Sequence, residues 1–400
     1  MKVCFINSLY YPDVVGGAEK SVQSLAETLV AGGHQAFVIT TARESKEYQV
    51  NGVKVYAVDL ANVYWPYGKK NKFLKPFWHT LDSYNPFMAG KVADILYKES
   101  PDVAHTNNLS GFSVAVFKEI KKREIPLIHT LRDYYLLCAR CMMFDKGENC
   151  RSQCRLCRVY GVSRKALSAH VDHVVGISRY ILDEHLAHGY FPQAVPSVIH
   201  NSYKLPPNVT VSREVVQNKV RFGFIGRLEP NKGVDLLIRA IRACGLDSRL
   251  SLVIAGTGEH EYTRYLMGLA EGMDIAFLGY VEPNDFFSKI DVTVVPSLWK
   301  EALGRVVIES YAYGKPVIAS QRGGLPEIVD HGETGFVFDP DDIDSLTALV
   351  KRFSGNRSMI ESMREACFAK AGTFFPEKIV GDYLSLYQMH IRPKFQTLRI

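Results

Sequence analysis

The segment Pro296 to Ser320, PSLWKEALGRVVIESYAYGKPVIAS, decides the fold class of this chain. The apolar residues Val292 to Val295 just before it predict a buried strand that ends at Pro296, and the apolar spacing from about Gly304 to Ala312 predicts a helix. A helix therefore begins just beyond the carboxyl end of a strand. Free N–H groups at such a helix start favour a phosphate, through hydrogen bonds and through the helix dipole.

Two carboxylates bracket the predicted helix start. Glu301 lies in the approach to the helix and Glu309 lies on the helix itself, an E-x7-E spacing. Backbone amides would hold phosphate there, while the carboxylates would accept hydrogen bonds from sugar hydroxyls. Taken alone the spacing is weak, because charged residues at this separation more often belong to a solvated helix face. The neighbouring residues favour a ligand site.

The whole segment resembles the donor site of the family-4 retaining glycosyltransferases, whose pattern is PS-xx-E-x-F-G-xxxx-E-A-x-A-x-G-x-P-V-I-A. Leu303 replaces the usual Phe and Ser310 the usual Ala, and both departures bear on pocket shape rather than on class. The resemblance continues through Gly323 to Ile328 and reaches most of the chain. The matching residues are Pro296, Ser297, Glu301, Gly304, Glu309, Ala312, Gly314, Pro316, Val317, Ile318 and Ala319.

Length and composition indicate a globular protein of two or three domains. The 400 residues are 47% apolar, which is enough for packed cores. The opening residues Met1 to Ile6 have a strand pattern rather than that of a signal peptide, and no stretch approaches the roughly 20 apolar residues that span a bilayer. We therefore expect a cytoplasmic protein. The net charge of +6, mixed with 42 acidic residues, argues against a nucleic-acid binder and suits a phosphorylated ligand or an anionic membrane surface.

The first half opens with the strand, glycine loop and helix of a nucleotide-binding unit. Met1 to Asn7 predicts a buried strand, and Gly16 and Gly17 precede a helix that ends near Gly33. Glycine lets the backbone approach a ligand closely, although an ordinary strand-to-helix turn has the same pattern. The resemblance implies that Gly16 and Gly17 close over the donor diphosphate from the opposite domain.

Residues 59 to 90 interrupt the alternation of strands and helices with aromatic and basic residues. This mixture suits a membrane interface, where amines meet lipid phosphates and rings lie among the headgroups. An acceptor-binding excursion or an ordinary packed insertion fits the pattern about as well. The residues concerned are Tyr64, Trp65, Tyr67, Phe73, Phe77, Trp78, Tyr84, Phe87, Lys69, Lys70, Lys72 and Lys75.

The strand predicted at Pro126 to Leu131 leads into Arg132 and Asp133. Members of the family often have His-Asp here, so Arg132 replaces the His. A guanidinium cannot act as a general base near neutral pH, and His129 could take that role only if the local geometry allows it. The resemblance implies that Arg132 and Asp133 are acceptor-side groups near the reacting carbon; a cap or a structural ion pair is the alternative.

Five cysteines follow directly and include two C-x2-C pairs around a short loop. This arrangement lets four thiolates converge on one tetrahedral zinc ion, and the loop has little apolar material around which to fold. An apparently cytosolic chain disfavours disulfides. We expect a structural zinc, with free thiols as the next alternative and an iron–sulfur site as the third. The candidate ligands are Cys138, Cys141, Cys150, Cys154 and Cys157.

The second half repeats the opening pattern. Val220 to Ile225 predicts a strand, and Gly226, Arg227 and Lys232 follow in the loop before a helix. Glycine at a strand end admits a phosphate, and two cations beside it neutralise its charge. The loop matches the family's G-R-L-xxx-K-G motif, which implies that Arg227 and Lys232 neutralise the leaving diphosphate. Two solvated basic residues are the alternative.

The predicted fold is α/β, the GT-B arrangement of two Rossmann-like, doubly wound domains that face each other across a cleft. The polar, proline-containing residues from Lys204 to Asn218 predict the linker. Residues 1–205 are the acceptor-side domain with a cysteine-rich insertion at 138–157, and residues 218–375 bind the nucleotide-sugar. The resemblance implies that a helix within residues 376–400 crosses back to the first domain.

The predicted function is transfer of a sugar, with retained configuration, from a nucleotide-sugar to an acceptor hydroxyl in polysaccharide, lipopolysaccharide or other glycoconjugate synthesis. We expect no cofactor for catalysis, because cations and amides replace a divalent metal. The catalytic candidates are Arg227, Lys232, Glu301, Asp133 and Arg132, and the donor-binding candidates are Gly16, Gly17, Gly226, Val281, Gly304, Arg305, Val306 and Glu309.

The expected partners are a nucleotide-sugar donor and a saccharide or lipid-linked saccharide acceptor, with peripheral contact to the inner face of a membrane and no nucleic acid. Two other functions fit the pattern. Another GT-B enzyme, such as a nucleotide-sugar epimerase, would release free epimerised sugar. A zinc-organised scaffold would bind a nucleotide-sugar without releasing the nucleoside diphosphate.

Overall fold

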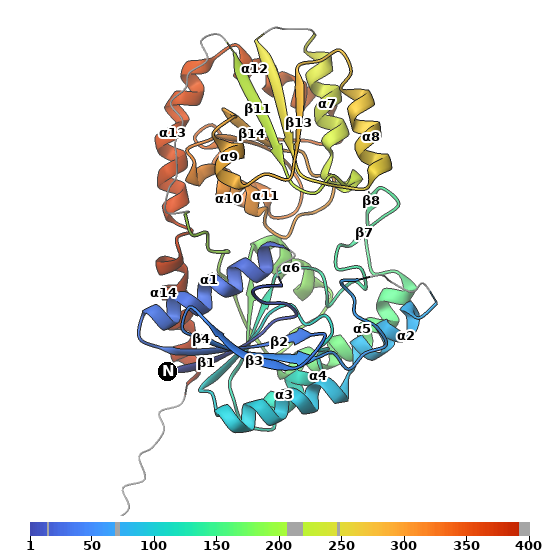
Figure 1. The fold of residues 1–400 in the computed structure, drawn as a ribbon, viewed down its shortest axis with the longest axis vertical. Coiled ribbons are helices and arrows are strands. Elements are labelled where there is room, and N and C mark those ends of the chain that lie inside the picture. Colours follow the sequence, from blue (N-terminus) through green and yellow to red (C-terminus); the bar gives the residue numbers. More distant parts are fainter. Residues whose placement is uncertain (14–15, 69–72, 206–218, 246–248, 392–400) are drawn as a thin grey trace, which may run out of the picture. The chain divides into compact units, whose positions relative to one another are not determined.

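The computed structural model describes residues 1–13, 16–68, 73–205, 219–245 and 249–391, and its contacts divide the chain into two units (Figure 1). Unit 1 comprises Met1–Met142, Ser152–Ser202 and the residues from Pro376 onward, and unit 2 comprises Met143–Arg151 and Tyr203–Phe375. The linker predicted at residues 204–218 falls almost entirely outside the described residues, as do Lys69, Lys70 and Lys72 of the basic aromatic segment.

Unit 1 is built on an eight-stranded sheet in the order β10-β9-β6-β5-β1-β2-β4-β3. β3 pairs antiparallel with β4, and the other neighbours run parallel. β6 is buried at every position, although its sequence, LIHTL, includes the polar residues His129 and Thr130. The strands are β1 (Lys2–Ile6), β2 (Gln35–Ala42), β3 (Lys46–Val50), β4 (Val53–Asp59), β5 (Val103–Thr106), β6 (Leu127–Leu131), β9 (His173–Gly176) and β10 (Val195–Val198).

Helices cover both faces of this sheet. One face packs against α1 and α14 in a shared hydrophobic core, and Figure 1 shows α3 and α4 on the opposite face. The helices of unit 1 are α1 (Gly17–Ala31), α2 (Lys75–Ser83), α3 (Pro86–Glu99), α4 (Ala115–Lys121), α5 (Arg155–Leu167), α6 (Arg179–Ala187) and α14 (Pro376–His390), with a short 3-10 turn at Ser168–His170.

A buried hydrogen-bond network fixes α14 to the sheet of unit 1. The Nδ1 atom of His105 lies 2.6 Å from the hydroxyl of Tyr387, and its Nε2 atom lies 2.7 Å from the hydroxyl of Thr130. The Thr130 hydroxyl is in turn 3.0 Å from that of Tyr383. Burial lowers the pKa of His105 well below its usual value, so that the ring is neutral in this network. The C-terminal helix is therefore part of unit 1.

Unit 2 contains a six-stranded parallel sheet in the order β13-β12-β11-β14-β15-β16. Its strands are β11 (Val220–Ile225), β12 (Leu250–Ala255), β13 (Ile275–Gly279), β14 (Val292–Val295), β15 (Val317–Ser320) and β16 (Gly335–Phe338). Its helices are α7 (Val234–Ala243), α8 (His260–Leu269), α9 (Pro283–Phe287), α10 (Arg305–Ala312), α11 (Leu325–Ile328), α12 (Ile343–Ser354) and α13 (Arg357–Gly372), with a 3-10 turn at Pro230–Lys232.

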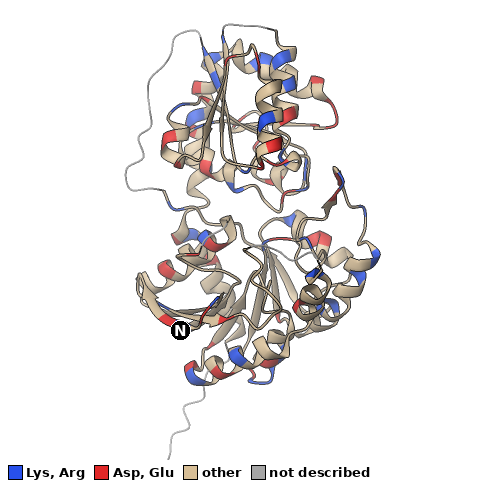
Figure 2. Ribbon diagram, turned by 45° about the vertical axis from the view of Figure 1, so that its right-hand side comes forward, with Lys and Arg blue, Asp and Glu red and all other residues tan. Residues whose placement is uncertain are grey.

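The alternation of side chains along β11 shows that this sheet is also covered on both faces. Phe222 and Phe224 join the core formed with α7 and α12, whereas a Cβ atom on Gly223 would lie 2.7 Å from the ring of Phe286 on α9. Figure 2 shows the strands of both units mostly without charged residues, which lie chiefly on helices and loops. Each unit thus has the doubly wound arrangement that the sequence predicts.

The cysteine-rich insertion differs from its predicted place. The sequence assigns all of residues 138–157 to the first domain, but Met143–Arg151, which holds the hairpin strands β7 (Phe144–Asp145) and β8 (Glu148–Asn149), belongs to unit 2 by its contacts. The reason is that the side-chain amide of Asn149 is hydrogen-bonded to the backbone of Leu298 and Lys300.

None of the helices among the described residues combines the length and the apolar character that crossing a membrane requires.

A buried ion pair joins α2 to α5. The Nη2 atom of Arg164 lies 2.9 Å from Oδ2 of Asp82, and both side chains are 1% exposed. The N–H of Gly111 donates to the other carboxylate oxygen at 2.6 Å, and the guanidinium lies 4.0 Å from the centre of the Tyr135 ring. Burial raises the pKa of Asp82 to about 6, and the charge of Arg164 limits that rise.

We predict that Arg164→Met destabilises the protein by about 3–5 kcal/mol near pH 7.5, because it leaves the Asp82 carboxylate buried without a countercharge. The loss should be smaller at pH 5: a carboxyl with a raised folded-state pKa destabilises the fold increasingly as pH rises through that pKa, and protonation removes the penalty. Urea unfolding at both pH values measures this. Lys165→Met, an exposed position on the same helix, is the control, and an equal loss in both variants would contradict the prediction.

Candidate active site

The candidate site lies at the carboxyl ends of β11 and β14, which are neighbours in the sheet of unit 2. Gly233, with φ of 68°, lies in the loop after β11, and a Cβ atom there would be 2.0 Å from the carbonyl oxygen of Pro296. The N–H of Leu298 donates to the carbonyl of Asn231 at 2.9 Å. Because only glycine fits at position 233, the two loops pack directly against each other.

This packing brings together Lys232 and Glu301, two of the predicted catalytic residues. The Nζ atom of Lys232 lies 2.7 Å from Oε1 of Glu301, and their side chains are 18% and 12% exposed. The hydroxyl of Ser297 donates to the same carboxylate oxygen at 2.8 Å, and the ammonium lies 4.9 Å from the centre of a Trp299 ring. The site therefore contains a fixed cation and a fixed carboxylate side by side.

The pKa of Glu301 reflects two opposing effects. Burial acts to raise it, but the charge of Lys232 and hydrogen bonds from Lys232, Ser297 and Trp299 together lower it below its usual value. Glu301 is therefore a carboxylate at neutral pH, able to accept hydrogen bonds from a ligand hydroxyl.

A glycine pair holds the backbone of Glu301. Gly324 donates its N–H to the Glu301 carbonyl at 2.8 Å. Gly323 has φ of 60°, and a Cβ atom there would lie 2.0 Å from the same carbonyl oxygen. The Gly-Gly step after β15 is therefore a structural requirement for the position of Glu301.

Asn149 is a site residue that the sequence does not reveal. Its Nδ2 atom donates to the carbonyl of Leu298 at 2.8 Å, and its Oδ1 atom accepts from the N–H of Lys300 at 2.9 Å. One side-chain amide thus binds the backbone on both sides of Trp299, immediately before Glu301. The sequence offers no signal for this contact, because Asn149 lies in a polar loop between cysteines.

Helix α10 begins directly after Gly304, which has φ of 97°. As in any α-helix, the first N–H groups, here near Arg305 and Val306, point out of the amino-terminal end. The Nε atom of Arg305 donates to Oε1 of Glu309 at 2.7 Å, and its guanidinium lies 5.5 Å from the centre of the Tyr203 ring. The predicted ribose-binding carboxylate is thus held by a cation from its own helix.

The remaining predicted donor residues of unit 2 are less enclosed. Arg227 is 64% exposed and pairs with Glu229 at 3.0 Å. Gly226 donates its N–H to the carbonyl of Ala255 at 3.0 Å, at the end of β11. Val281 lies half-buried in the loop after β13, two strands away from β11.

In unit 1, Asp133 is a partly buried carboxylate with an unusual pKa. It accepts hydrogen bonds from the side-chain amide of Asn108 at 2.9 Å and from the N–H of Tyr135 at 2.7 Å. Burial raises its pKa to about 6, the hydrogen bond from Tyr135 opposes that rise, and the charge of Glu19 adds to it. Asp133 therefore changes its charge near pH 6, and perturbed pKa values of this kind cluster at functional sites.

The neighbours of Asp133 are held by amides. Arg132 donates from Nε to Oδ1 of Asn107 at 2.8 Å, and from Nη1 to the side-chain oxygen of Asn201.

The predicted glycine pair of unit 1 lies at the start of α1. The N–H of Gly16 donates to Oε2 of Glu19 at 2.8 Å, and Gly17 is the first residue of the helix. Unit 1 thus contains its own set of predicted residues.

His129 does not have the geometry of a general base. It is buried, its Nδ1 atom lies 2.9 Å from the hydroxyl of Thr106, and its ring stacks on Phe191 with 5.7 Å between ring centres. Burial lowers its pKa to about 3. This ring is therefore a neutral core side chain and does not replace the missing His at position 132.

Three of the five motif cysteines lie together in unit 1. Cys157 is within hydrogen-bonding reach of the thiols of Cys138 and Cys154, which raises the pKa of Cys157. The N–H of Cys157 donates to the sulfur of Cys154 at 3.4 Å, and this bond lowers the pKa of Cys154. Over the described part of the chain, however, no group of three or more His, Cys, Asp or Glu side chains is arranged to hold a metal ion. The structural zinc, with Cys141 and Cys150 among its candidate ligands, stays a prediction.

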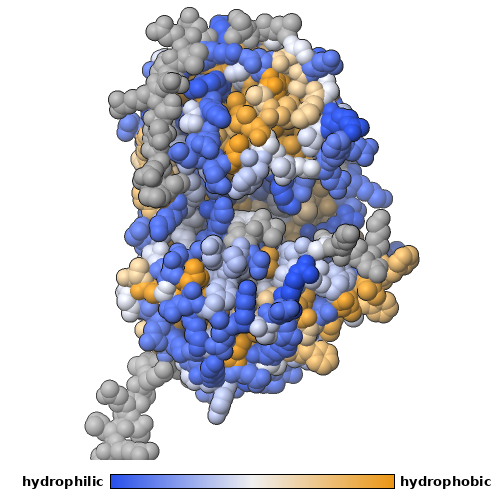
Figure 3. Space-filling view, in the orientation of Figure 1, coloured by the Kyte–Doolittle hydropathy of each residue, from blue (hydrophilic) through white to orange (hydrophobic). Residues whose placement is uncertain are grey.

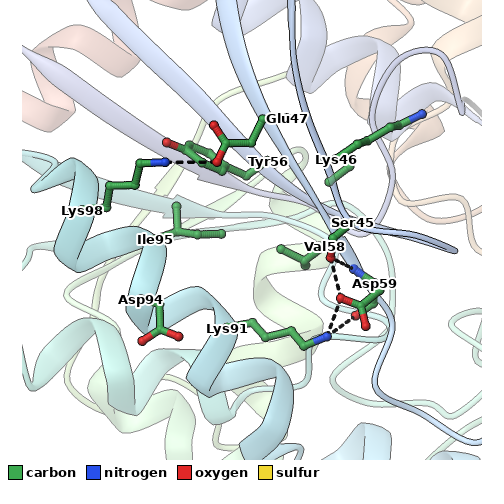
Figure 4. Close-up of a pocket in the computed structure, with 11 residues that line it drawn as sticks. Ser45, Lys46, Glu47, Tyr56, Val58, Asp59, Lys91, Asp94, Ile95 and Lys98 are labelled. Atoms are coloured by element: carbon green, nitrogen blue, oxygen red, sulfur yellow. Dashed lines mark hydrogen bonds and ion pairs between the residues drawn. The ribbon is translucent and has the colours of Figure 1, made fainter.

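Unit 1 also has a pocket of about 530 Å³ between β3, β4 and α3 (Figure 4). Lys91 pairs with Asp59 at 2.6 Å and Lys98 pairs with Glu47 at 3.1 Å, so that much of its charge is compensated internally. Its lining contains none of the predicted site residues, and we assign it no role. The lining residues are Ser45, Lys46, Glu47, Tyr56, Ala57, Val58, Asp59, Lys91, Asp94, Ile95 and Lys98.

Two family models match the chain, one over each half. The model of the glycosyl transferase 4-like domain matches residues 16–202, and that of the glycosyl transferases group 1 matches residues 211–370. The second match contains the Lys232 and Glu301 loops and helix α10.

Curated relatives extend over most of the chain. An uncharacterized 42.6 kDa protein in the cps region of Klebsiella pneumoniae is 37% identical over 351 residues, which are 86% of this chain and 92% of that protein. An uncharacterized glycosyltransferase of Methanocaldococcus jannaschii is 28% identical over 88% of both chains. A lipopolysaccharide 1,2-N-acetylglucosaminetransferase of Salmonella typhimurium is 30% identical over 45% of this chain and 51% of its own length.

Solved structures show the same fold. HepE from Anabaena in complex with UDP superimposes with a TM-score of 0.74 at 19% identity, covering 97% of this chain and 100% of HepE. The complex of HepE with UDP-glucose gives a TM-score of 0.69 at 19% identity, covering 96% and 100%. The predicted fold class, two Rossmann-like units of the GT-B type, is thereby confirmed, and the chain belongs to the group 1 glycosyl transferases.

Proposed function

We propose that this protein is a retaining glycosyltransferase that moves a hexosyl group from a nucleoside diphosphate sugar to a hydroxyl of a saccharide or lipid-linked saccharide. The observation that carries the proposal is the Lys232–Glu301 pair at the carboxyl ends of two parallel strands, next to the start of α10. Nucleotide phosphates bind at such strand ends and helix starts. Family membership supports the transfer reaction.

In this proposal, unit 2 binds the donor. The diphosphate lies against Lys232, Arg227 and the first N–H groups of α10, Glu301 accepts from the sugar hydroxyls, and Glu309 accepts from the ribose. Fixed positive charge at the departing oxygen stabilises the transition state without reorganisation, which is commonly the largest catalytic contribution. The complexes of HepE with UDP and with UDP-glucose make UDP-sugars the first donors to test.

The proposed reaction keeps the anomeric configuration. The bond between the anomeric carbon and the diphosphate oxygen breaks, and the acceptor oxygen bonds to the same face of the sugar. The proton of the acceptor hydroxyl passes to an oxygen of the leaving diphosphate. Asp133 and Arg132 are proposed to orient the acceptor, and the named activity of the Salmonella relative supports an acceptor of the lipopolysaccharide or polysaccharide class.

We expect Lys232→Met and Glu309→Gln each to lower kcat/KM for transfer about 10²- to 10³-fold, because each removes a group aimed at the donor. A coupled assay for nucleoside diphosphate release, together with chromatography of the sugar products, measures the effect and also detects free epimerised sugar. Lys289→Met, an exposed lysine of unit 2, is the matched control. If both site variants transfer sugar at the wild-type rate and unfold at the wild-type temperature, the assignment of this donor site is wrong.

The transfer rate is expected to fall on the acid side with a midpoint near pH 6, because Asp133 loses its charge as the pH falls through its raised pKa. The pKa of Asp82 lies in the same range, so the pH profile of the wild type alone does not identify the carboxylate responsible for the loss of activity at acid pH. The pH profile of Asp133→Asn does. Asp133→Asn should transfer more slowly and lack this acid limb, while its thermal unfolding keeps the wild-type pH dependence. An acid limb retained in Asp133→Asn would exclude this carboxylate.

Asn149→Ala should lower kcat by roughly ten-fold, because a 1 Å misplacement of a catalytic group can cost more than that and the variant releases the backbone before Glu301. Asn149→Asp keeps the bond from the Lys300 N–H but places a carboxylate beside the Leu298 carbonyl, so it should not restore activity. Glu148→Ala, in the same hairpin, is the control. Isothermal titration with UDP separates lost positioning from lost donor affinity, and wild-type kcat in Asn149→Ala would contradict the assignment.

A further inference from the structure

Large apolar side chains are exposed on α2, on α5 and just before α2 in unit 1. Phe73, Phe77, Leu156, Val159 and Val162 are between 65% and 89% exposed, and we call them the α2/α5 surface. The three residues on α5 recur every third position, which places them along one side of the helix. Figure 3 shows orange atoms at the edge of unit 1 where Figure 1 labels α2 and α5. Large apolar side chains exposed on two packed helices in this way indicate a binding partner.

The opposite sides of the two helices are locked together. Besides the buried ion pair of Asp82 and Arg164, the hydroxyl of Ser163 on α5 donates to the carbonyl of Ser83 on α2 at 2.8 Å. The rings of His79 and Tyr160 also pack with 5.5 Å between their centres. Since these polar and aromatic contacts fix the inward faces, neither helix can rotate to bury its apolar side.

The exposed charges on α2 and α5 have one sign. Lys75 on α2 and Arg155, Arg158 and Lys165 on α5 are exposed. In α2 and α5, which are both described in full, the acidic residue is Asp82, and that carboxylate is buried against Arg164. The sequence has no Asp or Glu between Glu148 and Asp172. The apolar surface is therefore bordered by cations without an exposed acid on either helix.

We propose that the α2/α5 surface docks the protein onto an anionic phospholipid bilayer. Phenyl and aliphatic side chains enter the region between headgroups and acyl chains, while arginine and lysine stems extend to the lipid phosphates. A second copy of the chain fits poorly on this surface, because it would place arginine against arginine. The proposal does not depend on the donor site, which lies in unit 2.

This surface differs from the one that the sequence suggests. Within residues 59–90, Trp78 is buried and donates from its ring N–H to the carbonyl of Tyr64 at 3.1 Å, and Trp65 is half-buried. Phe73 and Phe77 remain exposed. The α5 residues were not part of the predicted membrane segment. The membrane contact that we propose therefore extends beyond that segment to the helix that follows the cysteine-rich hairpin.

The test is flotation of the full-length protein with vesicles of phosphatidylcholine, with and without phosphatidylglycerol. We expect binding to the anionic vesicles, weakened by salt, and at least ten-fold less binding to phosphatidylcholine alone. The double variant Arg155→Glu/Arg158→Glu should bind more than ten-fold more weakly, since each cation near an anionic surface contributes roughly five-fold. Phe77→Ser/Val159→Ser should lose binding to a similar degree.

Tyr97→Ser is the matched control, because Tyr97 is an equally exposed aromatic residue of unit 1 on α3. It should bind the anionic vesicles as the wild type does. The α2/α5 variants replace exposed side chains, and thermal unfolding checks that they fold. Equal binding of wild type and both double variants would overturn the proposal. So would a lipid-free dimer, seen by analytical ultracentrifugation, that Phe77→Ser/Val159→Ser abolishes, since the surface would then bind a second copy.

Discussion

The ion pair of Lys232 and Glu301 is the contact on which the candidate site depends. Two largely buried charges lose hydration, and their mutual attraction repays that loss only when the geometry is good and further hydrogen bonds are present. Here the hydroxyl of Ser297 supplies such a bond, and Gly233 and Gly323 allow the loops to approach closely enough. Such an ion pair adds little to the free energy of unfolding by itself. Its position at the end of a strand is therefore better explained by ligand binding than by a contribution to stability.

Much of this arrangement follows from the sequence. The apolar run of Val292 to Val295 predicts β14, the spacing after Gly304 predicts α10, and parallel strands bring their carboxyl ends to one edge of the sheet. Lys232 and Glu301 could therefore be assigned to one site, although the motifs lie far apart in the chain. Their direct pairing was not predictable, because it depends on two close backbone approaches rather than on either motif alone.

Other features left no usable pattern in the sequence. The amide of Asn149 binds backbone atoms about 150 residues away, and backbone partners impose no residue type that could be recognised. On α5, apolar residues at every third position resemble a helix face that packs into a core, and the structure shows that face exposed. The contact that decides the orientation of α5 is the burial of Arg164 against Asp82, a residue type that a sequence reading assigns to the surface.

The two cations of the proposed donor loop, Arg227 and Lys232, differ in how strongly their ion pairs hold them. Arg227 is mostly exposed and its ion pair with Glu229 is a surface pair, which contributes little, so it can turn to a ligand phosphate at small cost. Lys232 and Glu301 are largely buried together, and separating them would leave two uncompensated charges. A bound diphosphate can replace the carboxylate as the partner of Lys232, whereas a neutral sugar cannot. In the proposed donor site, release of Glu301 toward the sugar would therefore depend on the arrival of the diphosphate, and carbohydrate recognition would require the activated form of the donor.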